Sequence, residues 1–271
     1  MLTPRQKALR ILALGLKRLG LREVVVTRQL ARRRQQRTRQ EAAGVDRLSR
    51  PAAFALDTQL DAILDRDDGY FVEAGANDGF QQSNTYWLEK FRGWTGLLVE
   101  PMPELAAEAR RNRGAATVVQ CALVPPDGEA VVRMRFGDLT SSLSGTQPDS
   151  WSDQGLAFGW RDAYELEVPA RTLSAVLDEV AAPEIDLLSL DIEGYEAQAL
   201  LGLDLSRHAP RYVLVEIHEP ELNRPAIDAL LDDAYAEHGW LSPIDLLYVR
   251  RDLVRAAAGA PVATARPSTT G

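Results

Sequence analysis

Between residues 70 and 250 the chain alternates short apolar runs with amphipathic stretches in which apolar residues return every three or four positions. The short runs have the length of buried strands, and the amphipathic stretches have the period of helices. This alternation predicts an α/β fold with a mostly parallel sheet and helices on both faces. The predicted strands are 70–74, 96–100, 117–124, 185–191 and 212–218, and the predicted helices are 84–91, 103–112, 173–180, 196–203 and 226–237.

Three further segments are rich in residues that favour strands. Residues 129–136 and 164–171 predict a hairpin beside the main sheet. Residues 246–250 predict a strand that closes the main sheet as an antiparallel edge strand.

A long stretch between the two hairpin strands, residues 137–163, breaks the pattern and contains Trp151, Phe158 and Trp160. Loops of this length in a compact domain are usually functional or disordered, and three large aromatic residues argue against plain disorder. We predict a lid or a surface that binds the acceptor substrate, with a small aromatic cluster under the loop as the alternative.

The two ends of the chain differ from the α/β part. Residues 4–19 predict an amphipathic helix with leucines on one stripe, and residues 32–50 predict a polar helix or linker whose arginines form a solvated face. Residues 256–271 lack periodicity and predict a disordered tail. We therefore divide the chain into a basic helical extension (1–50), one α/β domain (51–255) and the tail.

Charge is distributed unevenly along the chain. Residues 1–50 hold 14 Lys plus Arg against 3 Asp plus Glu, whereas the remaining residues hold 17 against 36. The acidic body argues against nucleic acid as a substrate, because phosphate backbones require a basic face. Contact with an anionic membrane surface or a multienzyme partner is predicted only through the helix at 4–19, and a helix that packs on its own domain is the alternative.

A single cysteine and the absence of a long apolar run bear on location. Cys121 excludes a disulfide within the chain and fits a reducing compartment, so we predict a cytoplasmic protein that is associated with membranes only if residues 4–19 bind them. No apolar stretch reaches the roughly 18 residues that a transmembrane helix needs.

The first predicted strand runs into a glycine-bounded turn, Gly75-Ala76-Asn77-Asp78-Gly79. Gly75 and Gly79 allow positive φ and close approach of a ligand to the backbone, so the turn predicts a cofactor site. A dinucleotide fingerprint would need glycine where Asn77 and Phe80 stand, and a phosphate loop would need a lysine that the turn lacks. Neither phosphate-binding pattern fits.

Acids accompany the turn instead. Glu73 precedes the turn and Asp78 lies within it, which favours a ligand with a cationic end, and S-adenosylmethionine is such a ligand. Glu100 ends the second predicted strand, 25 residues after Gly75, where a carboxylate accepts hydrogen bonds from ribose hydroxyls in nucleotide-binding sheets. A solvated strand end before Pro101 is the alternative for Glu100.

Five motifs follow one another along residues 70–240. They are Val72-Glu73-Ala74-Gly75-Ala76-Asn77-Asp78-Gly79, Ser83-Asn84-Thr85, Leu98-Val99-Glu100-Pro101, Ser141-Ser142-Leu143 and Leu190-Asp191-Ile192-Glu193-Gly194-Tyr195-Glu196. In this order the motifs resemble the FkbM-type methyltransferases. The resemblance implies a class I, Rossmann-like methyltransferase fold and transfer of a methyl group from S-adenosylmethionine to oxygen, commonly on a sugar or natural-product hydroxyl.

Resemblance and position together indicate the cofactor contacts. Glu73 stands where many class I enzymes have aspartate, and its longer carboxylate would reach the cofactor directly or through water. Ala122 would lie beside the adenine. The full predicted set is Glu73, Gly75, Asn77, Gly79, Ser83, Glu100 and Ala122.

Polar residues gather at the ends of the fourth and fifth predicted strands. Asp191 and Glu193 are two residues apart, as are Glu216 and His218, so each pair points to one side of an extended strand. His218 is the first candidate for a base that takes a proton from the acceptor hydroxyl, and Asp191 is the second or a partner of the cofactor's amine. The same side chains offer ligands to a divalent metal, and the sequence leaves a metal requirement open.

Two other functions compete with methyl transfer. A nicotinamide-dependent oxidoreductase would use a similar sheet, but Asn77 and Phe80 disfavour it. A non-catalytic Rossmann-like module would dock through its N-terminal helix. The sequence leaves open whether the acceptor is a sugar, a glycoconjugate or a natural product, and it leaves the oligomeric state open.

Overall fold

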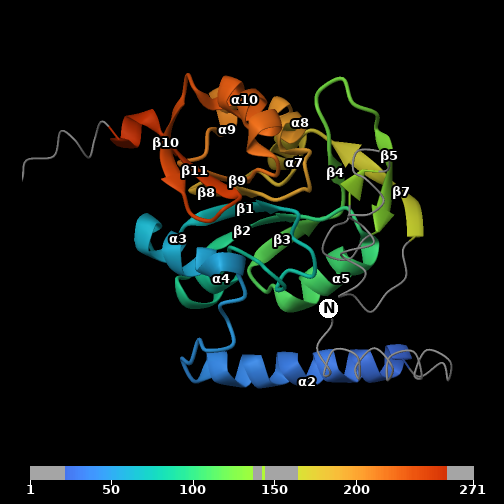
Figure 1. Cartoon of the computed structure of the whole chain (residues 1–271). Helices are drawn as coiled ribbons and strands as arrows, with labels where there is room; N and C mark the ends of the chain where they lie inside the picture. Colours follow the sequence, from blue (N-terminus) through green and yellow to red (C-terminus); the bar gives the residue numbers. More distant parts are fainter. Residues whose placement is uncertain (1–21, 137–141, 144–163, 255–271) are drawn as a thin grey trace, which may run out of the picture.

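A computed structural model of the chain describes residues 22–136, 142–143 and 164–254 (Figure 1). The predicted helix at 4–19, most of the loop at 137–163 and the tail at 256–271 lie outside the described residues. No helix among the described residues is both long enough and apolar enough to cross a bilayer.

A seven-stranded sheet forms the centre of the molecule, in the order β10-β11-β9-β8-β1-β2-β3. In this order, β9, β8, β1, β2 and β3 are each parallel to their neighbours in that group. β11 runs antiparallel to both β9 and β10. This arrangement confirms the predicted Rossmann-like sheet, mostly parallel with antiparallel pairing at one edge. The strands are β1 (Tyr70–Ala74), β2 (Thr95–Val99), β3 (Ala116–Val119), β8 (Leu187–Leu190), β9 (Tyr212–Glu216), β10 (Tyr235–Trp240) and β11 (Asp245–Arg250).

Two predictions at the C-terminal side of the sheet were wrong. The helix predicted at 226–237 is α10 (Pro220–Leu231), and the chain after it forms β10. The polar sequence of β10 does not predict a strand. Tyr235–Trp240 forms one because it pairs with β11. The strand predicted at 246–250 is therefore not the edge strand, because β10 covers its outer side.

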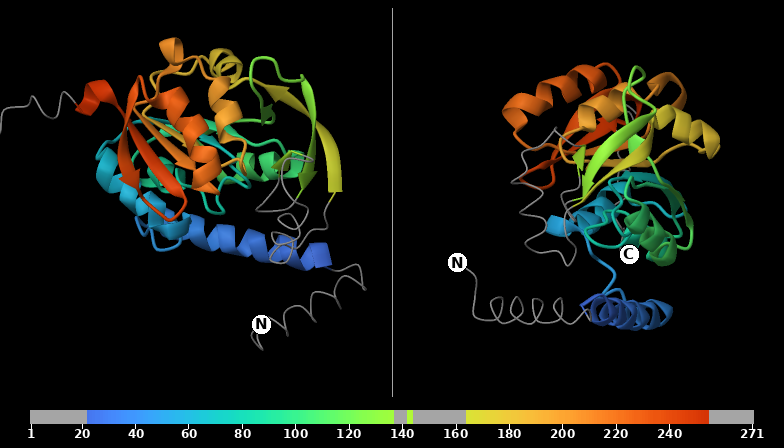
Figure 2. Two further views of the ribbon diagram at one scale, coloured as in Figure 1. Left: turned by 45° about the horizontal axis from the view of Figure 1, so that its top comes forward. Right: turned by 90° about the vertical axis from the view of Figure 1, so that its right-hand side faces the viewer.

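The strand predicted at 117–124 is two strands in two sheets. β3 ends at Val119, and β4 (Ala122–Leu123) joins a second sheet of order β4-β7-β5-β6. The predicted side hairpin is confirmed there, since β5 (Val131–Phe136) and β7 (Tyr164–Arg171) pair antiparallel. The short strand β6 (Ser142–Leu143) completes this sheet. The second sheet stands beside the carboxyl ends of the central strands (Figures 1 and 2).

Helices cover both faces of the central sheet (Figure 1). On one face lie α3 (Leu56–Leu64), α4 (Tyr86–Phe91) and α5 (Pro103–Asn112), preceded by the short 3-10 helix η1 (Ala53–Ala55). On the other lie α7 (Leu173–Glu179), α8 (Glu196–Leu201), α9 (Leu205–His208) and α10.

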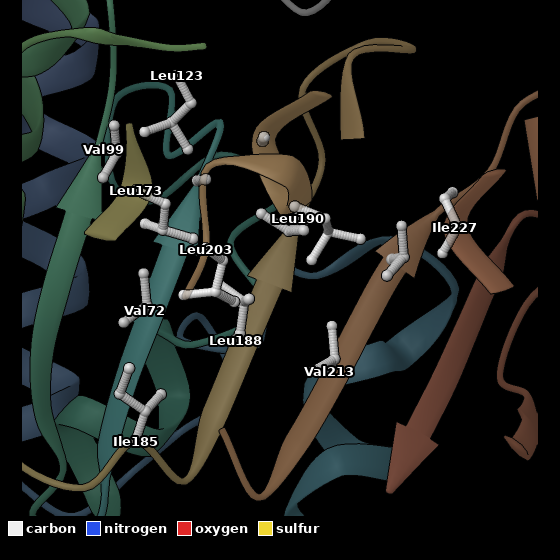
Figure 3. Close-up of a cluster of buried hydrophobic side chains, with 14 of the residues drawn as sticks. Val72, Val99, Leu123, Leu173, Ile185, Leu188, Leu190, Leu203, Val213 and Ile227 are labelled. Carbon is white, nitrogen blue, oxygen red and sulfur yellow. The ribbon is translucent and has the colours of Figure 1, made fainter. Parts of the chain in front are cut away.

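Alternate side chains of each central strand enter opposite cores. Val72 of β1 packs with Leu188 and Val213 toward α7, α8 and α10 (Figure 3). Phe71, the preceding residue, joins the core under α3 and α4. Because a strand turns successive side chains to opposite faces, strands that are apolar at every position require cover on both sides.

The helix α2 (Arg22–Ala42) lies outside the layer formed by α4 and α5 (Figure 1). Three of its arginines, Arg32, Arg33 and Arg39, are exposed, as the polar pattern predicts. Arg37 is an exception, with only 6% of its surface exposed. The prediction that the arginines of this segment form only a solvated face was therefore wrong at this residue.

Candidate functional site

A pocket opens beyond the carboxyl ends of β1, β2 and β8, bounded on one side by the second sheet. Open α/β sheets bind ligands at this edge, near the point where the strand order reverses. The walls carry four carboxylates, and none of the described residues that line the pocket is Lys or Arg. The four acids are Glu73, Glu100, Asp191 and Glu193.

Gly75 lines the pocket at the end of β1 and has φ +83°. A Cβ atom at this position would lie 1.7 Å from the main-chain oxygen of Asp191, so only glycine lets the end of β1 pass so close to the end of β8. Asn77 lines the pocket too, in the left-handed region with φ 48°. The two residues therefore give the turn its shape.

Gly79 has a different environment from the other predicted cofactor contacts. It has φ +74°, and a Cβ atom here would lie 2.9 Å from Cα of Ala109 on α5. Gly79 is not among the residues that line the pocket. Packing of the turn against α5 therefore explains why glycine is needed at position 79.

Glu100 lies at the end of β2, in the pocket wall and nearly buried. Its carboxylate accepts hydrogen bonds from the backbone N–H groups of Asn77 (2.8 Å) and Met102 (2.9 Å). Burial nevertheless raises the pKa of Glu100 to about 8. A ligand whose hydroxyls donate to this carboxylate would replace part of the lost hydration and favour its ionised form.

Glu73 also borders the pocket, but its carboxylate is engaged by the chain that follows the turn. One oxygen accepts from the backbone N–H of Asn84 (2.8 Å). The other accepts from the hydroxyls of Ser83 (2.9 Å) and Thr85 (2.6 Å) and lies 3.4 Å from Nη1 of Arg113. The direct role of Glu73 in the structure is to hold residues 83–85 against β1.

Arg113 is the centre of this buried network, with a side chain that is completely inaccessible to solvent. Its Nε donates to Glu89 of α4 at 2.5 Å. Its Nη1 donates to the backbone oxygen of Gly79 and to Ser83, and Nη2 donates to Thr85. One guanidinium therefore ties α4, α5 and the turn together behind the pocket.

Six of the seven predicted cofactor residues line one pocket, and Gly79 is the exception. Ser83 lies in the wall beside Glu73, and Ala122 lies opposite, next to Leu123 and Leu105. Sequence reasoning missed the role of Arg113, because an arginine after a helix end gives no local sign of burial. It also missed Asn84 and Ser189, which line the pocket and are joined by a hydrogen bond of 3.1 Å.

The acids at the ends of β8 and β9 meet as the strand pairing predicts. Asp191 and Glu193 line the pocket, whereas Glu216 and His218 are not among the lining residues. Nε2 of His218 is 3.1 Å from a carboxylate oxygen of Glu216. The turn that follows β8 is held by Glu196, whose carboxylate accepts hydrogen bonds from the backbone N–H groups of Ile192 and Gly194, both at 3.0 Å.

Burial and mutual repulsion shift the pKa values of this cluster. Burial, reinforced by the charge of Glu216, raises the pKa of Asp191 well above its usual value. Burial also raises the pKa values of Glu193 and Glu216 to about 8 each. The cluster therefore favours a cationic ligand or a bound proton.

Among the residues that the structure describes, Glu193, Glu216 and His218 each offer one metal-ligand atom, all within 4.8 Å of one another. Two carboxylates and one imidazole suit a first-row transition metal better than Mg²⁺. Asp191, which the sequence groups with them, is not part of this set.

The strand order and the acid-lined pocket at the carboxyl edge define a class I methyltransferase-type domain. The Methyltransferase FkbM domain family matches residues 73–239, and the chain belongs to this family.

Relatives with assigned names are also methyltransferases. The chain is 31% identical to the methyltransferase sdnD of Sordaria araneosa, over 60% of this chain and 72% of that protein. It is 25% identical to the 2-O-methyltransferase NoeI of Sinorhizobium fredii, over 69% and 78%. It is 30% identical to the 31-O-demethyl-FK506 methyltransferase FkbM of Streptomyces tacrolimicus, over 48% and 57%.

The matches among solved structures are distant in sequence. A TehB-like SAM-dependent methyltransferase from Corynebacterium glutamicum has 11% identity and a TM-score of 0.39, over 80% of this chain and 95% of that one. The METTL16 MTase domain has 9% identity and a TM-score of 0.42, over 73% and 66%.

The buried network predicts a large effect of removing its cation. Arg113→Met leaves Glu73 and Glu89 without their buried partner, and we expect a loss of about 3–5 kcal/mol in the free energy of unfolding. Urea denaturation measures it. Arg111→Ala is the control, because that side chain is 55% exposed and, among the described residues, pairs with Glu108 at the surface. A loss below about 1 kcal/mol in Arg113→Met would contradict the role of the network.

The raised pKa of Glu100 predicts pH-dependent stability of the ligand-free protein. Because the folded-state pKa is about 8 against an ordinary value of 4.5, the stabilising effect of the protonated form is complete below pH 4.5 and is lost as pH rises through 8. The free energy of unfolding of Glu100→Gln, relative to that of the wild type, should therefore rise by on the order of 2–4 kcal/mol from pH 5 to pH 8. Urea denaturation at both pH values, with exposed Glu129→Gln as the control, checks this. A difference that is independent of pH contradicts the assignment.

Proposed function

We propose that this chain transfers the methyl group of S-adenosylmethionine to a hydroxyl oxygen of a sugar, glycoconjugate or natural product. The family supplies methyl transfer. The pocket with four carboxylates and no Lys or Arg among its described lining residues is the observation that supports a cationic methyl donor. Two relatives that bear O-methyltransferase names, NoeI and FkbM, support oxygen as the atom that is methylated.

The residues present fit the proposed cofactor. Glu100 offers a carboxylate to the two ribose hydroxyls, as acids at the second strand do in nucleotide-binding sheets. Ala122 and its apolar neighbours Leu105 and Leu123 offer a flat wall for the adenine. Asn77 and Ser83 offer polar groups at the turn. When bound, S-adenosylmethionine supplies an electrophilic methyl group on a sulfonium.

Asp191 is the proposed base. It lines the pocket and faces the same space as the turn, so it can reach an acceptor hydroxyl placed there. Methyl transfer is an in-line displacement, and aligning the acceptor oxygen about 3–3.5 Å from the methyl carbon is the larger part of catalysis. The sequence-based prediction that His218 is the base stays a prediction. His218 is not among the described residues that line the pocket, and its Nε2 lies 3.1 Å from Glu216, which favours an indirect role.

The pocket weighs against a nicotinamide-dependent oxidoreductase. A pyrophosphate would meet a wall of carboxylates. Tyr86 and Lys90 have the Tyr-x-x-x-Lys spacing of some hydride-transfer enzymes, but the Tyr86 hydroxyl bonds to Arg37 and Glu41 outside the pocket. Lys90 bonds to Glu89. This pair therefore does not favour the rival function.

Location and partners remain part of the proposal. Cys121 as the only cysteine supports a cytoplasmic enzyme. A small molecule or saccharide is the proposed acceptor, and the acidic body weighs against nucleic acid. Contact of residues 4–19 with a membrane surface or a multienzyme assembly is a separate expectation that concerns residues outside those described.

Ligand-dependent stability and turnover test the function. S-adenosylmethionine or S-adenosylhomocysteine should raise the melting temperature, and incubation with hydroxylated glycosides and natural products should release S-adenosylhomocysteine with a methylated product detected by mass spectrometry. Glu100→Ala should weaken binding of S-adenosylhomocysteine by calorimetry. Stabilisation by NAD alone would contradict the proposal.

Substitution of the two candidate bases separates their roles. We expect Asp191→Asn to lower kcat by about 10²–10⁴-fold, because the proton acceptor is lost, while the affinity for S-adenosylhomocysteine stays within a few-fold. His218→Asn should lower kcat by less. Single-turnover rates measured across pH 6–9 check both. The reverse order of the two effects would move the base from Asp191 to His218.

A further inference from the structure

Arg37 is a buried arginine on a helix that carries exposed arginines on either side of it, Arg33 and Arg39. Removing a guanidinium from water is costly unless partners replace its hydration, so its burial requires specific contacts. α2 lies far from the pocket along the sequence, and Figure 2 shows it along the outer side of the α4 and α5 layer. The partners of Arg37 decide what this helix does.

Four groups surround the guanidinium. Its Nε donates to the hydroxyl of Tyr86 at 2.9 Å, and Nη2 donates to Oδ1 of Asn112 at 3.1 Å. Its Cζ lies 3.6 Å from the centre of the Phe80 ring, which is a close cation–π contact. Glu41, one turn further along α2, lies 3.6 Å from the same guanidinium.

Two of these contacts, with Phe80 and with Asn112, reach residues 75–83, the glycine-bounded turn and the four residues after it, which border the pocket. Phe80 directly follows Gly79 in this segment, and its ring packs edge-on against Tyr86 with centroids 4.9 Å apart. Asn112 uses its other end to donate to the backbone oxygen of Asp78 at 2.7 Å. The turn is thus held from outside by Arg37, through the Phe80 ring and through Asn112.

The inner side of the same segment, residues 75–83, lines the pocket through Asn77, Gln81, Gln82 and Ser83. Two of these residues are strained, because Asn77 has φ 48° and Gln82 has φ 57°. Non-glycine residues in the left-handed region cost of order 1 kcal/mol or more each and persist only where the surroundings hold them. A turn of this kind needs external support to keep its binding geometry.

We propose that Arg37 is a positioning residue for the cofactor site, and that α2 is a functional part of the methyltransferase domain. The guanidinium fixes the outer side of residues 77–83, so that their inner side is preformed for the cofactor. This inference rests on the proposed binding of S-adenosylmethionine at the pocket. Arg37 acts through the turn and does not itself line the pocket.

The expected effect concerns cofactor affinity and leaves the chemical step intact. If loss of Arg37 lowers the population of the competent turn to about a tenth, the apparent Kd rises about tenfold. The kcat at saturating cofactor should remain within about twofold, because Asp191 and its neighbours belong to other strands. A residue that supported only overall stability would not produce this split between KM and kcat.

Arg37→Ala in the full chain tests the proposal, and Arg39→Ala, an exposed arginine two residues along the same helix, is the matched control. Calorimetry with S-adenosylhomocysteine and the KM for S-adenosylmethionine should each show about tenfold weaker binding in Arg37→Ala and no more than twofold in Arg39→Ala. Arg37→Lys should be intermediate, because one ammonium group cannot bond Tyr86 and Asn112 in the same fork. Unchanged affinity in a folded Arg37→Ala protein overturns the proposal.

A second variant covers the case in which Arg37→Ala does not fold. Phe80→Leu keeps both hydrogen bonds of Arg37 and removes only the ring beneath it, and we expect about three- to tenfold weaker binding of S-adenosylhomocysteine. Equal affinity in Phe80→Leu and the wild type overturns the proposal.

Hydrogen exchange distinguishes failure of this proposal from failure of the proposed function. In Phe80→Leu and Arg37→Ala the amides of residues 77–84 should exchange faster, while those of β1 and β8 remain unchanged. Unchanged exchange at 77–84 overturns the positioning role, whatever the ligand. A wild-type protein that binds neither S-adenosylmethionine nor S-adenosylhomocysteine overturns the proposed function instead.

Discussion

The buried guanidinium of Arg113 is the contact on which the candidate site depends. It lies between two buried carboxylates, Glu73 of β1 and Glu89 of α4, and it also bonds the turn that joins these elements. A charge in this position is tolerated only because nearly every donor finds an acceptor. Once that network forms, the path of residues 79–85 is fixed, and so is the back wall of the pocket.

The pocket in front of this network is unusual in its charge. Acids at the ends of the parallel strands β1, β2 and β8 meet at one edge, and burial, reinforced by nearby acids, raises the pKa values of Glu100 and Glu193 to about 8. Such an arrangement is unfavourable for the empty protein and favourable for a cationic ligand. The same electrostatic cost that weakens the ligand-free fold thus supports the proposed donor, a trade of stability for function that is common at binding sites.

The sequence predicted most of the sheet and much of the site, for local reasons. Apolar runs such as Tyr70–Ala74 form strands because their own side chains need cover on both faces. Gly75 and Glu100 were recognisable because a turn with positive φ and a strand-end acid are local features. The errors arose where pairing overrides local preference: Tyr235–Trp240 is polar and becomes a strand only against β11. Gly79 was predicted as a cofactor contact, but in the structure it packs against Ala109 of α5.

The sequence by itself determined the fold class, the order of the motifs and the presence of acids at the strand ends, because these follow from periodicity and from chain direction in a parallel sheet. Only the tertiary structure decided which candidate base faces the pocket: the sequence ranks His218 before Asp191, whereas Asp191 lines the pocket and His218 is not among its described lining residues. It also decided the roles of Arg37 and Arg113. An arginine carries the same charge in every sequence, and only the partners that folding brings from α4, α5 and the turn determine whether it is solvated or buried.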